Sequence, residues 1–455
     1  MLSTHPLASD VSSLRSQLEG AVVLPAEDAW DTARQAWNLA VDQRPALVAL
    51  PRSAADVQAL VDFARSHGLR IAMQGTGHNA APMGPLDDTM LVKTSEMRGV
   101  EIDEADSVAR VEAGALWLDV TAPASEAGLA PLAGSSPDVG VVGYTLGGGL
   151  SWLGRRYGLA CNRLLAVELV TADGQLIRAT RHEYAEVFWA LRGGGGNFGA
   201  VVAIEFELIP LRKVYAGMLL FPWERSREVM HAWREWTTTV PDSVTTSARI
   251  PPMPELPDFL RGRGLVVIDG AIVEDDERAA ELLAPLRALG PEMDTFDSIA
   301  PVGLSYIHMD PEHPVPAISD SAMLDGLTAE TIDALVDATG PGSGSPLLMA
   351  ELRHLGGALG RYAGGALSRF DGEYLYFALG IPMDHAVTAA LEAQFALAGA
   401  AVASQASGRQ YLNFAERPTD PAAFYGEETY ARLRRVKAQV DPLELFRGNH
   451  EIPAA

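Results

Sequence analysis

Cysteine is almost absent from this chain of 455 residues, in which Cys161 is the single example. One cysteine excludes a disulfide within the chain and a metal site built from several thiolates, and we expect no metal. Basic residues are also scarce, because 35 lysines and arginines stand against 59 aspartates and glutamates, for a net charge of −24. Such a surface repels phosphate backbones, so we expect no nucleic-acid partner.

Long apolar runs are missing as well. No stretch reaches the roughly 18 consecutive apolar residues of a membrane span, so no membrane partner is expected. The first residues, MLSTHPLASDVSSLRSQLEG, lack the basic start and the apolar core of a signal peptide. A cytoplasmic location is the resulting expectation. Apolar residues still make up 48% of the chain, enough for a large buried core.

The chain divides into three parts by composition. Residues 1–212 alternate expected strands and helices and hold nearly all of the glycine-rich loops. Residues 213–405 are richer in proline, with long loops such as 249–257 (RIPPMPELP), and mix helices with strands. Residues 406–455 contain a short aromatic stretch, an expected helix and the ending DPLELFRGNHEIP. A chain of this length is typical of about three domain-sized units.

Glycine is concentrated in residues 74–80 (QGTGHNA), 133–151 (AGSSPDVGVVGYTLGGGLS) and 192–199 (RGGGGNFG). The first and third stretches match the dinucleotide pattern G-x-G-x-x-G/A, which in a Rossmann fold lies between a strand and a helix. Neither stretch has that context, because one runs into APMGPLDD and the other into a β-branched strand. Successive backbone N–H groups of glycine loops also bind phosphate without a helix. The pattern therefore favours a dinucleotide held by backbone groups of several loops.

Six motifs follow one another along the chain: RPALVALP, LRIAMQGTGHN, SSPDVGVVGYTLGGGLSWLGRRYGLACNRL, EVFWALRGGGGNFGAV, YLN and RLRRVKAQVDPLELFRGN. In this order they resemble the family of 6-hydroxy-D-nicotine oxidase and the berberine bridge enzyme-like oxidases, which have the vanillyl-alcohol-oxidase type of FAD fold. The resemblance implies an α+β protein with a two-part FAD-binding domain over residues 1–212. Residues 213–405 would form a substrate domain with an antiparallel sheet. Residues 406–455 would return to the FAD domain.

The flavin tether is the most specific implication of this resemblance. The family's first loop ends in a histidine that bonds covalently to the 8α-methyl of the flavin, and His78 occupies that place. Many relatives add a second bond from a cysteine in the second loop, where this chain has Ser136. A serine hydroxyl is far less nucleophilic than a thiolate, so the resemblance implies FAD bound covalently through His78 alone. Cys161 lies off this position and is expected to be a packed thiol.

The other FAD contacts implied by the family motifs are backbone groups and small side chains. They are Gly75, Thr76, Gly77 and Asn79 in the first loop, Ser135, Ser136, Val139, Gly140, Gly143, Tyr144 and Thr145 in the second, and Asn162, Val202, Asn413 and Asn449 elsewhere. Tyr144 departs from the family, since many members carry histidine there, near the pyrimidine edge of the ring. A phenol donates one hydrogen bond but carries no positive charge.

Tyr411, in YLNF, matches the tyrosine that acts as base or substrate clamp in several relatives. The alternative is a core tyrosine whose hydroxyl is in contact with water. Asn413 lies two residues later and is expected on the same strand face, as a partner of the flavin or of Tyr411.

Two strands of the substrate domain supply further candidates. In MAELRHL, Glu351 and Arg353 share a face and are expected to act in catalysis and in substrate binding; an ion pair or a solvated face is the alternative. Tyr374 and Tyr376 share a face of EYLYFALGI and are expected either in the substrate pocket or in the core.

The resemblance implies an oxidase that removes a hydride from an alcohol or amine carbon of a small organic molecule, such as a secondary metabolite or a sugar, and passes the electrons to dioxygen. Val139, three residues after Ser136, matches a position where valine goes with oxidases and leucine with dehydrogenases in plant relatives. The alternatives are a dehydrogenase with another acceptor, a flavin-dependent cyclase or isomerase, and a non-enzymatic flavin-binding protein. Tyr411 argues against the last of these. The sequence leaves the oligomeric state open.

Overall fold

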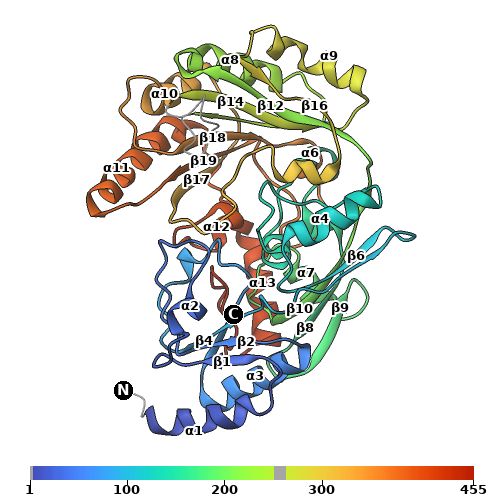
Figure 1. Ribbon diagram of the computed structural model, residues 1–455, viewed down its shortest axis with the longest axis vertical. Helices are drawn as coiled ribbons and strands as arrows, with labels where there is room; N and C mark the ends of the chain where they lie inside the picture. Colours follow the sequence, from blue (N-terminus) through green and yellow to red (C-terminus); the bar gives the residue numbers. More distant parts are fainter. Residues whose placement is uncertain (1–3, 251–262) are drawn as a thin grey trace.

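The computed structural model describes residues 4–250 and 263–455. Of the proline-rich loop expected at 249–257, everything after Ile250 lies outside the described residues. Figure 1 shows two units, one above the other: the first part of the chain and the C-terminal segment build most of the lower unit, and the residues between them build the upper unit. The fold is α+β, with a large antiparallel sheet in the upper unit, as the sequence predicts.

The lower unit begins with a four-stranded sheet of order β1-β2-β4-β3, in which β2, β4 and β3 run parallel. Its strands are β1 (Ala21–Val23), β2 (Leu47–Leu50), β3 (Arg70–Gln74) and β4 (Thr89–Lys93), and the segments around them are α1 (Thr4–Arg15), α2 (Trp30–Arg34), α3 (Ala54–His67) and η1 (Ala81–Met83). Helix α3 begins where the Ser53 side chain accepts a hydrogen bond from the Asp56 N–H, and it ends at Gly68 with φ +65°. Strand β3 leads directly into the first glycine loop.

A second, five-stranded antiparallel sheet has the order β5-β6-β10-β8-β9. Its strands are β5 (Val100–Asp103), β6 (Val108–Glu112), β8 (Leu164–Val170), β9 (Leu176–Thr180) and β10 (Ala200–Glu207). Around it lie α4 (Trp117–Glu126), α5 (Val141–Leu146), α6 (Gly154–Tyr157), η2 (Ala160–Arg163), α7 (Ala185–Leu191) and the pair β7 (Leu129–Ala130) and β11 (Ile209–Pro210). The predicted hairpin is present as β8 and β9, and Gly174 in its turn has φ +84°.

The upper unit is built on one antiparallel sheet of order β15-β12-β14-β13-β18-β19-β17, and β16 pairs with β12 beside β15. Its strands are β12 (Val214–Pro222), β13 (Val244–Ile250), β14 (Leu265–Ile272), β15 (Met293–Asp294), β16 (Asp297–Ile299), β17 (Ile318–Leu324), β18 (Met349–His354) and β19 (Tyr374–Gly380). Its helices are η3 (Trp223–Arg225), α8 (Ser226–Thr237), α9 (Asp276–Arg287), η4 (Pro301–Ser305), α10 (Ala329–Thr339), η5 (Gly357–Gly360), α11 (His385–Val402) and η6 (Ala403–Gln405).

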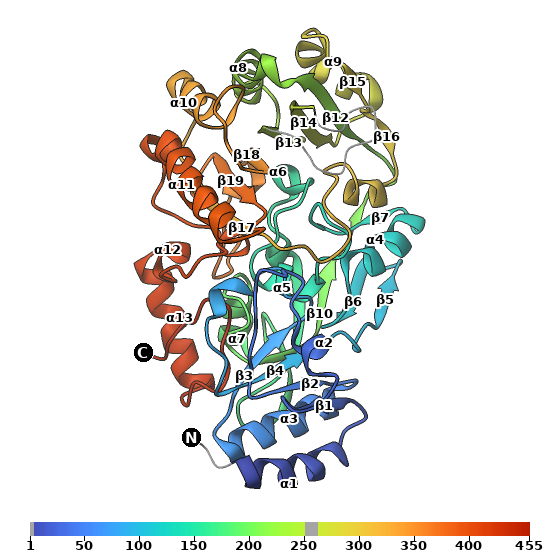
Figure 2. The same cartoon turned by 60° about the vertical axis from the view of Figure 1, so that its left-hand side comes forward.

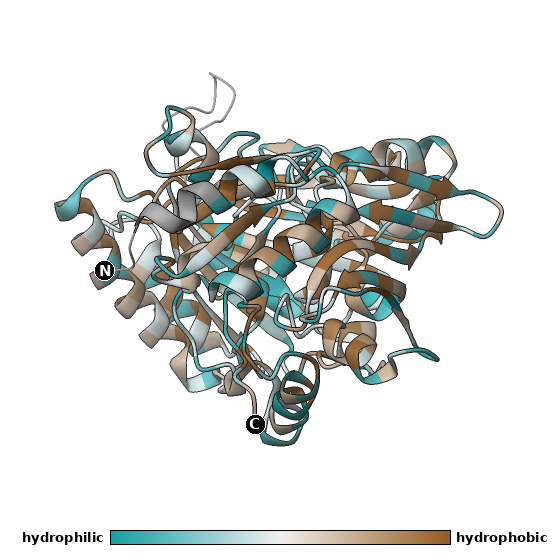
Figure 3. Ribbon diagram, turned by 90° about the horizontal axis from the view of Figure 1, so that it is seen from below, coloured by the Kyte–Doolittle hydropathy of each residue, from teal (hydrophilic) through white to brown (hydrophobic). Residues whose placement is uncertain are grey.

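The two faces of this sheet differ in chemistry. Alternate strand residues such as Leu352 and Tyr376 pack with α8, α9, α10 and α11 into one hydrophobic core. Strands are predominantly brown in Figure 3, whereas helices mix brown with teal, as expected for helices that bury one side. The opposite face of β13, β14 and β18 carries buried polar side chains, among them Arg249, Asp269 and Glu351. This polar face is turned toward the lower unit.

Helix α11 with η6 (His385–Gln405) is long and apolar enough to cross a membrane by length and composition alone. It is a weak indication, because Leu391, Phe395 and Ala398 pack on the sheet and belong to the core of the upper unit. A helix with one face buried in a core is ordinary in globular domains.

The C-terminal segment ties itself to the lower unit through α12 (Ala422–Tyr425) and α13 (Glu427–Val440), which Figure 2 shows along one side of that unit. Beyond α13, the Ile71 N–H donates to the Leu445 carbonyl and the Arg447 N–H donates to the Ile71 carbonyl. The last residues therefore extend the sheet beside β3, next to the first glycine loop.

The third glycine loop, 192–199, holds this C-terminal segment. The Asn197 side chain accepts hydrogen bonds from the backbone N–H groups of Gly448 and Ile452 and donates to the His450 carbonyl. Lys437, fully buried, donates to the Asn197 carbonyl at 2.7 Å and to Asp441 at 2.6 Å. The Asn197 side chain and carbonyl therefore anchor α13 and the chain end, while the expected role of this loop's backbone N–H groups in holding a dinucleotide stays a prediction.

Replacing Lys437 tests this anchor. Lys437→Met leaves the buried Asp441 carboxylate without its counter-charge, and we expect the free energy of unfolding to fall by about 3–5 kcal/mol. Arg435→Met, on the exposed side of the same helix, should change it by no more than about 0.5 kcal/mol. Urea unfolding of both variants measures the difference, and equal midpoints would show that the ion pair does not anchor the segment.

Candidate active site

The first and second glycine loops lie against each other at the top of the lower unit. A β-carbon added at Gly140 would come within 3.7 Å of the Thr76 side chain. Gly77 has φ +87°, and a β-carbon there would clash with Gln74 at 2.8 Å, so this turn requires glycine. The loops thus form a close pair of backbone segments with few side chains between them.

Several buried polar atoms on these loops have no partner in the protein. They are both amide atoms of Gln74, Nε2 of His78, Oδ1 of Asn79 and Oγ1 of Thr145, and Nε1 of Trp152 lies just beyond the second loop. A buried polar atom without a hydrogen bond is costly, so such a group of them indicates a bound polar ligand. Loops of glycine that offer backbone N–H groups, with amide and hydroxyl side chains beside them, fit a dinucleotide such as FAD.

His78 is held from two sides. Its ring stacks on Trp37 with 3.9 Å between ring centroids and an interplanar angle of 20°. Its Nε2 atom lies 3.4 Å from Oδ1 of Asp138. The same carboxylate accepts hydrogen bonds from Nε1 of Trp37 and from Oγ of Ser136, the latter at 2.7 Å. Among the described residues Nε2 has no hydrogen bond and meets Asp138 only at ion-pair distance, so the carboxylate lies beside Nε2 and not beside Nδ1.

Tyr411 is 1% exposed, and its hydroxyl contacts the second loop. The hydroxyl oxygen accepts hydrogen bonds from the Gly149 N–H at 2.9 Å and from Nδ2 of Asn413 at 3.1 Å. Burial raises the pKa of Tyr411 above its ordinary value, although these two donors oppose the rise. The expected strand is instead the 3-10 turn η7 (Leu412–Phe414), because the Phe414 N–H bonds back to the Tyr411 carbonyl. The side chains of Tyr411 and Asn413 nevertheless form the expected contact.

Tyr144 has its hydroxyl turned into the protein. It donates to the Leu132 carbonyl at 3.1 Å, and its ring packs edge-on against Trp117. Burial raises the pKa of Tyr144 well above its ordinary value, so the phenol is neutral at physiological pH. Its expected role beside the flavin ring stays a prediction, and in this arrangement the hydroxyl's donor is already in use.

A buried ionic network roofs the two loops. His308 donates from Nδ1 to Asp310 at 2.7 Å and from Nε2 to Glu351 at 3.0 Å. Arg353 donates to the second oxygen of Glu351 at 2.9 Å. Burial alone would lower the pKa of His308, and Arg249 acts in the same direction, but the carboxylates of Asp310 and Glu351 outweigh both and raise it to about 9. His308 is therefore an imidazolium at neutral pH.

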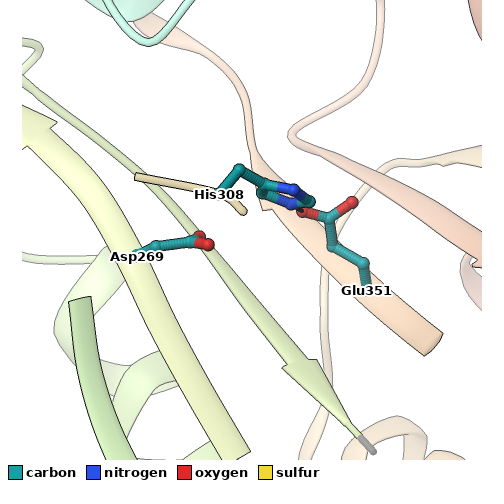
Figure 4. Close-up of side chains that lie close together, drawn as sticks. All are labelled: Asp269, His308 and Glu351. Atoms are coloured by element: carbon teal, nitrogen blue, oxygen red, sulfur yellow. Dashed lines mark hydrogen bonds and ion pairs between the residues drawn. The ribbon is translucent and has the colours of Figure 1, made fainter. Parts of the chain in front are cut away.

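Asp269, His308 and Glu351 lie close enough to hold a metal ion, and Figure 4 shows their polar atoms turned toward one another. Two arginines already supply the positive charge that such an ion would bring. Arg249 lies 2.8 Å from Asp269, and Arg353 pairs with Glu351. The three acidic and three basic groups of the network balance, since Asp310 pairs with His308. We therefore interpret the cluster as a structural ion network and not as a metal centre.

The network also reaches the second loop. Oγ of Ser135 donates to Asp310 at 2.6 Å, which joins the flavin-binding unit to the roof. Arg353 lies over the rings of Phe414 and Trp152, 4.9 and 5.9 Å from their centroids. A small cavity lies where the two units meet and is lined by Ser135, Leu150, Ser151, Trp152, Thr245, Thr246, Arg353, His354 and Leu355. This cavity is the candidate substrate pocket.

Three expected site residues have other surroundings. Glu351 is fully buried, and Arg353 and His308 hold its pKa well below the usual range despite the opposing effect of burial, so the alternative of an ion pair applies and Glu351 is no free base. Tyr374 and Tyr376 lie on the helix-covered face of β19, where Tyr374 bonds Thr237. Their expected substrate contact is corrected to a core position. The pocket side of β19 carries Leu375 and Phe377 instead, which pack near Tyr411 and Phe414.

The remaining expected FAD contacts are spread unevenly. Asn79 and Asn449 lie together, since Nδ2 of Asn449 donates to the Asn79 carbonyl at 3.4 Å. The Val139 carbonyl in the second loop accepts a hydrogen bond from the Trp117 N–H at the start of α4, and the Val202 carbonyl in β10 accepts one from the Ala113 N–H after β6. The remaining candidates on the two loops are Gly75 and Gly143. A β-carbon added at Gly75 would lie 3.7 Å from the Ala113 carbonyl oxygen, and one added at Gly143 would have no atom within 4 Å.

Asn162 departs from this group. Its amide is fully used by Arg192 and by the carbonyls of Leu367 and Ser368. A direct side-chain contact from Asn162 to the cofactor is therefore not supported by this arrangement.

Sequence reasoning missed the residues that support the site: Trp37, Asp138, His308 and Asp310. Asp138 did carry a signal, because a carboxylate in the middle of an apolar glycine loop, SSPDVGVVG, needs a partner. His308 and Asp310, in HMDP, carried none, since the partners that reveal them, Glu351 in β18 and Ser135 on the second loop, are distant in sequence.

Comparison with known proteins also indicates an FAD-binding protein. Residues 45–180 match the FAD binding domain family, and residues 410–453 match the family described as berberine and berberine like. (R)-6-hydroxynicotine oxidase of Paenarthrobacter nicotinovorans is 30% identical over 456 residues, which cover 96% of this chain and 97% of that protein.

Solved structures share the fold. Physcomitrella patens BBE-like 1 has a TM-score of 0.85 at 20% identity and covers 98% of this chain and 99% of its own. Glucooligosaccharide oxidase from Acremonium strictum has a TM-score of 0.83 at 21% identity with the same coverage, and its cofactor is described as a 6-S-cysteinyl, 8α-N1-histidyl FAD. At these identities the likeness shows the fold alone.

The ionic roof is expected to stabilise the protein less as the pH becomes alkaline. The folded-state pKa of His308, about 9, lies above its ordinary value of 6.5, so its stabilising contribution is complete below about pH 6.5 and is lost as the pH rises through 9. We expect the stability difference between the wild type and His308→Gln to shrink over this interval. Urea unfolding from pH 6 to pH 10 measures it, and a difference independent of pH would contradict a charged His308.

Proposed function

Because this chain belongs to the family of FAD-linked oxidoreductases related to 6-hydroxynicotine oxidase and the berberine-like enzymes, we propose that it is an oxidase of a small organic molecule. Its substrate gives up a hydride from an alcohol or amine carbon. The observation that carries this proposal is the meeting of three parts: His78 on the first glycine loop, Tyr411 of the C-terminal segment with its hydroxyl on the second loop, and the cavity beneath the roof. A flavin-binding protein without enzymatic activity needs neither Tyr411 nor a cavity.

FAD is held by the two loops and is bound covalently through His78 alone. Support comes from the position of His78 at the end of the first loop and from Ser136, whose hydroxyl is committed to Asp138. When bound, the flavin supplies the redox chemistry by accepting the hydride and passing two electrons on.

Tyr411 accepts the substrate proton. Burial favours the protonated hydroxyl, whereas the Gly149 N–H and the Asn413 amide donate to its oxygen and favour the phenolate. The phenolate form is the base: it accepts the substrate proton in concert with hydride loss, and the phenol then releases this proton to solvent before the next turnover. The roof excludes water from this region, since Arg353 covers Trp152 and Phe414.

The tether is tested on the denatured protein. We expect flavin fluorescence in the gel band of the wild type after acid denaturation, and none in that of His78→Ala. The loops still offer backbone donors in this variant, so it keeps weakly bound FAD or loses it. His182→Ala, at an exposed histidine between β9 and α7, should keep the bound flavin. Complete release of flavin from the wild type would contradict a covalent bond to His78.

The base is tested with Tyr411→Phe, which removes only the hydroxyl. Loss of general-base help should slow anaerobic reduction of the flavin by about 10²–10⁴-fold. Tyr374→Phe makes the same change in a buried tyrosine of the helix-covered core and should leave the rate nearly unchanged. The assignment fails if stopped-flow absorbance shows the same bleaching rate for Tyr411→Phe and the wild type.

Dioxygen is the proposed electron acceptor, because Val139 stands at the position where valine goes with oxidases and the longer leucine with dehydrogenases in plant relatives. Anaerobically reduced enzyme mixed with aerated buffer should reoxidise rapidly and release peroxide. Val139→Leu should slow this step and leave reduction by substrate nearly unchanged. Slow reoxidation of the wild type, with fast reaction toward artificial quinones, would instead identify a dehydrogenase.

A further inference from the structure

We propose that Asp138 is a positioning residue for flavin attachment: it orients His78 with Nδ1 toward the cofactor and balances the charge that the new bond creates. This inference rests on the covalent tether proposed above. The inference is based on the Asp138 carboxylate, which lies in the second glycine loop and contacts the His78 imidazole, the Trp37 indole and the Ser136 hydroxyl.

The Asp138 carboxylate is fixed in place. Its side chain is 19% exposed, and a carboxylate so far removed from water is stable only where it has partners. Trp37 donates to one oxygen and Ser136 to the other, while Nε2 of His78 lies 3.4 Å from the latter. Burial would raise the pKa of Asp138, but the contacts with His78, Ser136 and Trp37 keep it below the ordinary value. The group is therefore an anion at neutral pH.

The His78 ring is oriented by the same partners. Trp37 stacks on its face and fixes the ring plane, and Asp138 faces Nε2, so a flip of the imidazole within that plane would lose the contact with Asp138. A carboxylate beside Nε2 favours the tautomer with the proton on that nitrogen, which leaves a lone pair on Nδ1. The nucleophile is thus presented in one orientation and one protonation state.

Charge balance explains why the partner is an acid. Attachment forms a bond between Nδ1 of His78 and the 8α-carbon and breaks one C–H bond of that methyl, whose proton leaves to solvent. The two electrons of the C–H bond reduce the flavin, and dioxygen removes them as hydrogen peroxide. Bonding at Nδ1 with Nε2 still protonated gives the imidazole a positive charge. Asp138 lies close to that charge and stabilises it as it forms.

The test follows attachment and not turnover. Full-length protein is produced under riboflavin limitation and mixed with FAD in aerated buffer, and the flavin that stays with acid-precipitated protein is followed over time. Asp138→Asn keeps the size and removes the charge, and we expect attachment to slow by about 10- to 100-fold. Total FAD binding and the melting temperature should be nearly unchanged. Asp138→Glu should recover part of the rate, and Asp87→Asn, an exposed control next to the first loop's end, should match the wild type.

The outcomes separate the two claims. Attachment in Asp138→Asn at the wild-type rate overturns the role of Asp138 and leaves the tether intact. A parallel loss of FAD binding and of melting temperature, with no specific loss of attachment, shows a merely structural carboxylate and also overturns it. If the wild type binds FAD and never attaches it, the covalent tether fails first, and the role of Asp138 fails with it.

Discussion

Buried charges join the parts of this molecule, because each is stable only where another part of the chain supplies its partner. Lys437 on α13 pairs with Asp441 and holds the third glycine loop. Asp310 of the upper unit accepts a hydrogen bond from Ser135 on the second loop. The first and second glycine loops carry buried polar atoms that have no hydrogen-bond partner in the protein. The candidate cofactor site is thus marked by unsatisfied polar atoms on loops that buried ion pairs hold in place.

This arrangement separates two tasks. The loops bind through backbone and small polar groups, which suits a large cofactor, whereas the roof places a balanced set of ions above them. Because the roof's charges are mutually compensated, it presents Arg353 and aromatic rings to the cavity without a net charge. A roof of this kind brings no net charge to the cavity.

The sequence predicted whatever depends on local pattern or on the family's motifs. The hairpin at Gly174, the helix closed by Gly68, the α+β class and the FAD family all belong here. It failed where side chains meet across long distances. Strand alternation showed that Tyr374 and Tyr376 share a face, but only the packing of α8, α10 and α11 decides which face is the core. Glu351 could be recognised as part of a network only once His308, distant in sequence, was beside it.

Peptide mapping of the purified protein tests the central claim most directly. After proteolysis, the yellow peptide is isolated and its sequence and mass are determined. The account predicts that the peptide containing GTGHN carries one flavin on His78 and that the peptide containing Ser136 carries none. Flavin on any other residue, or an unmodified His78 peptide from protein that still contains bound FAD, would contradict it.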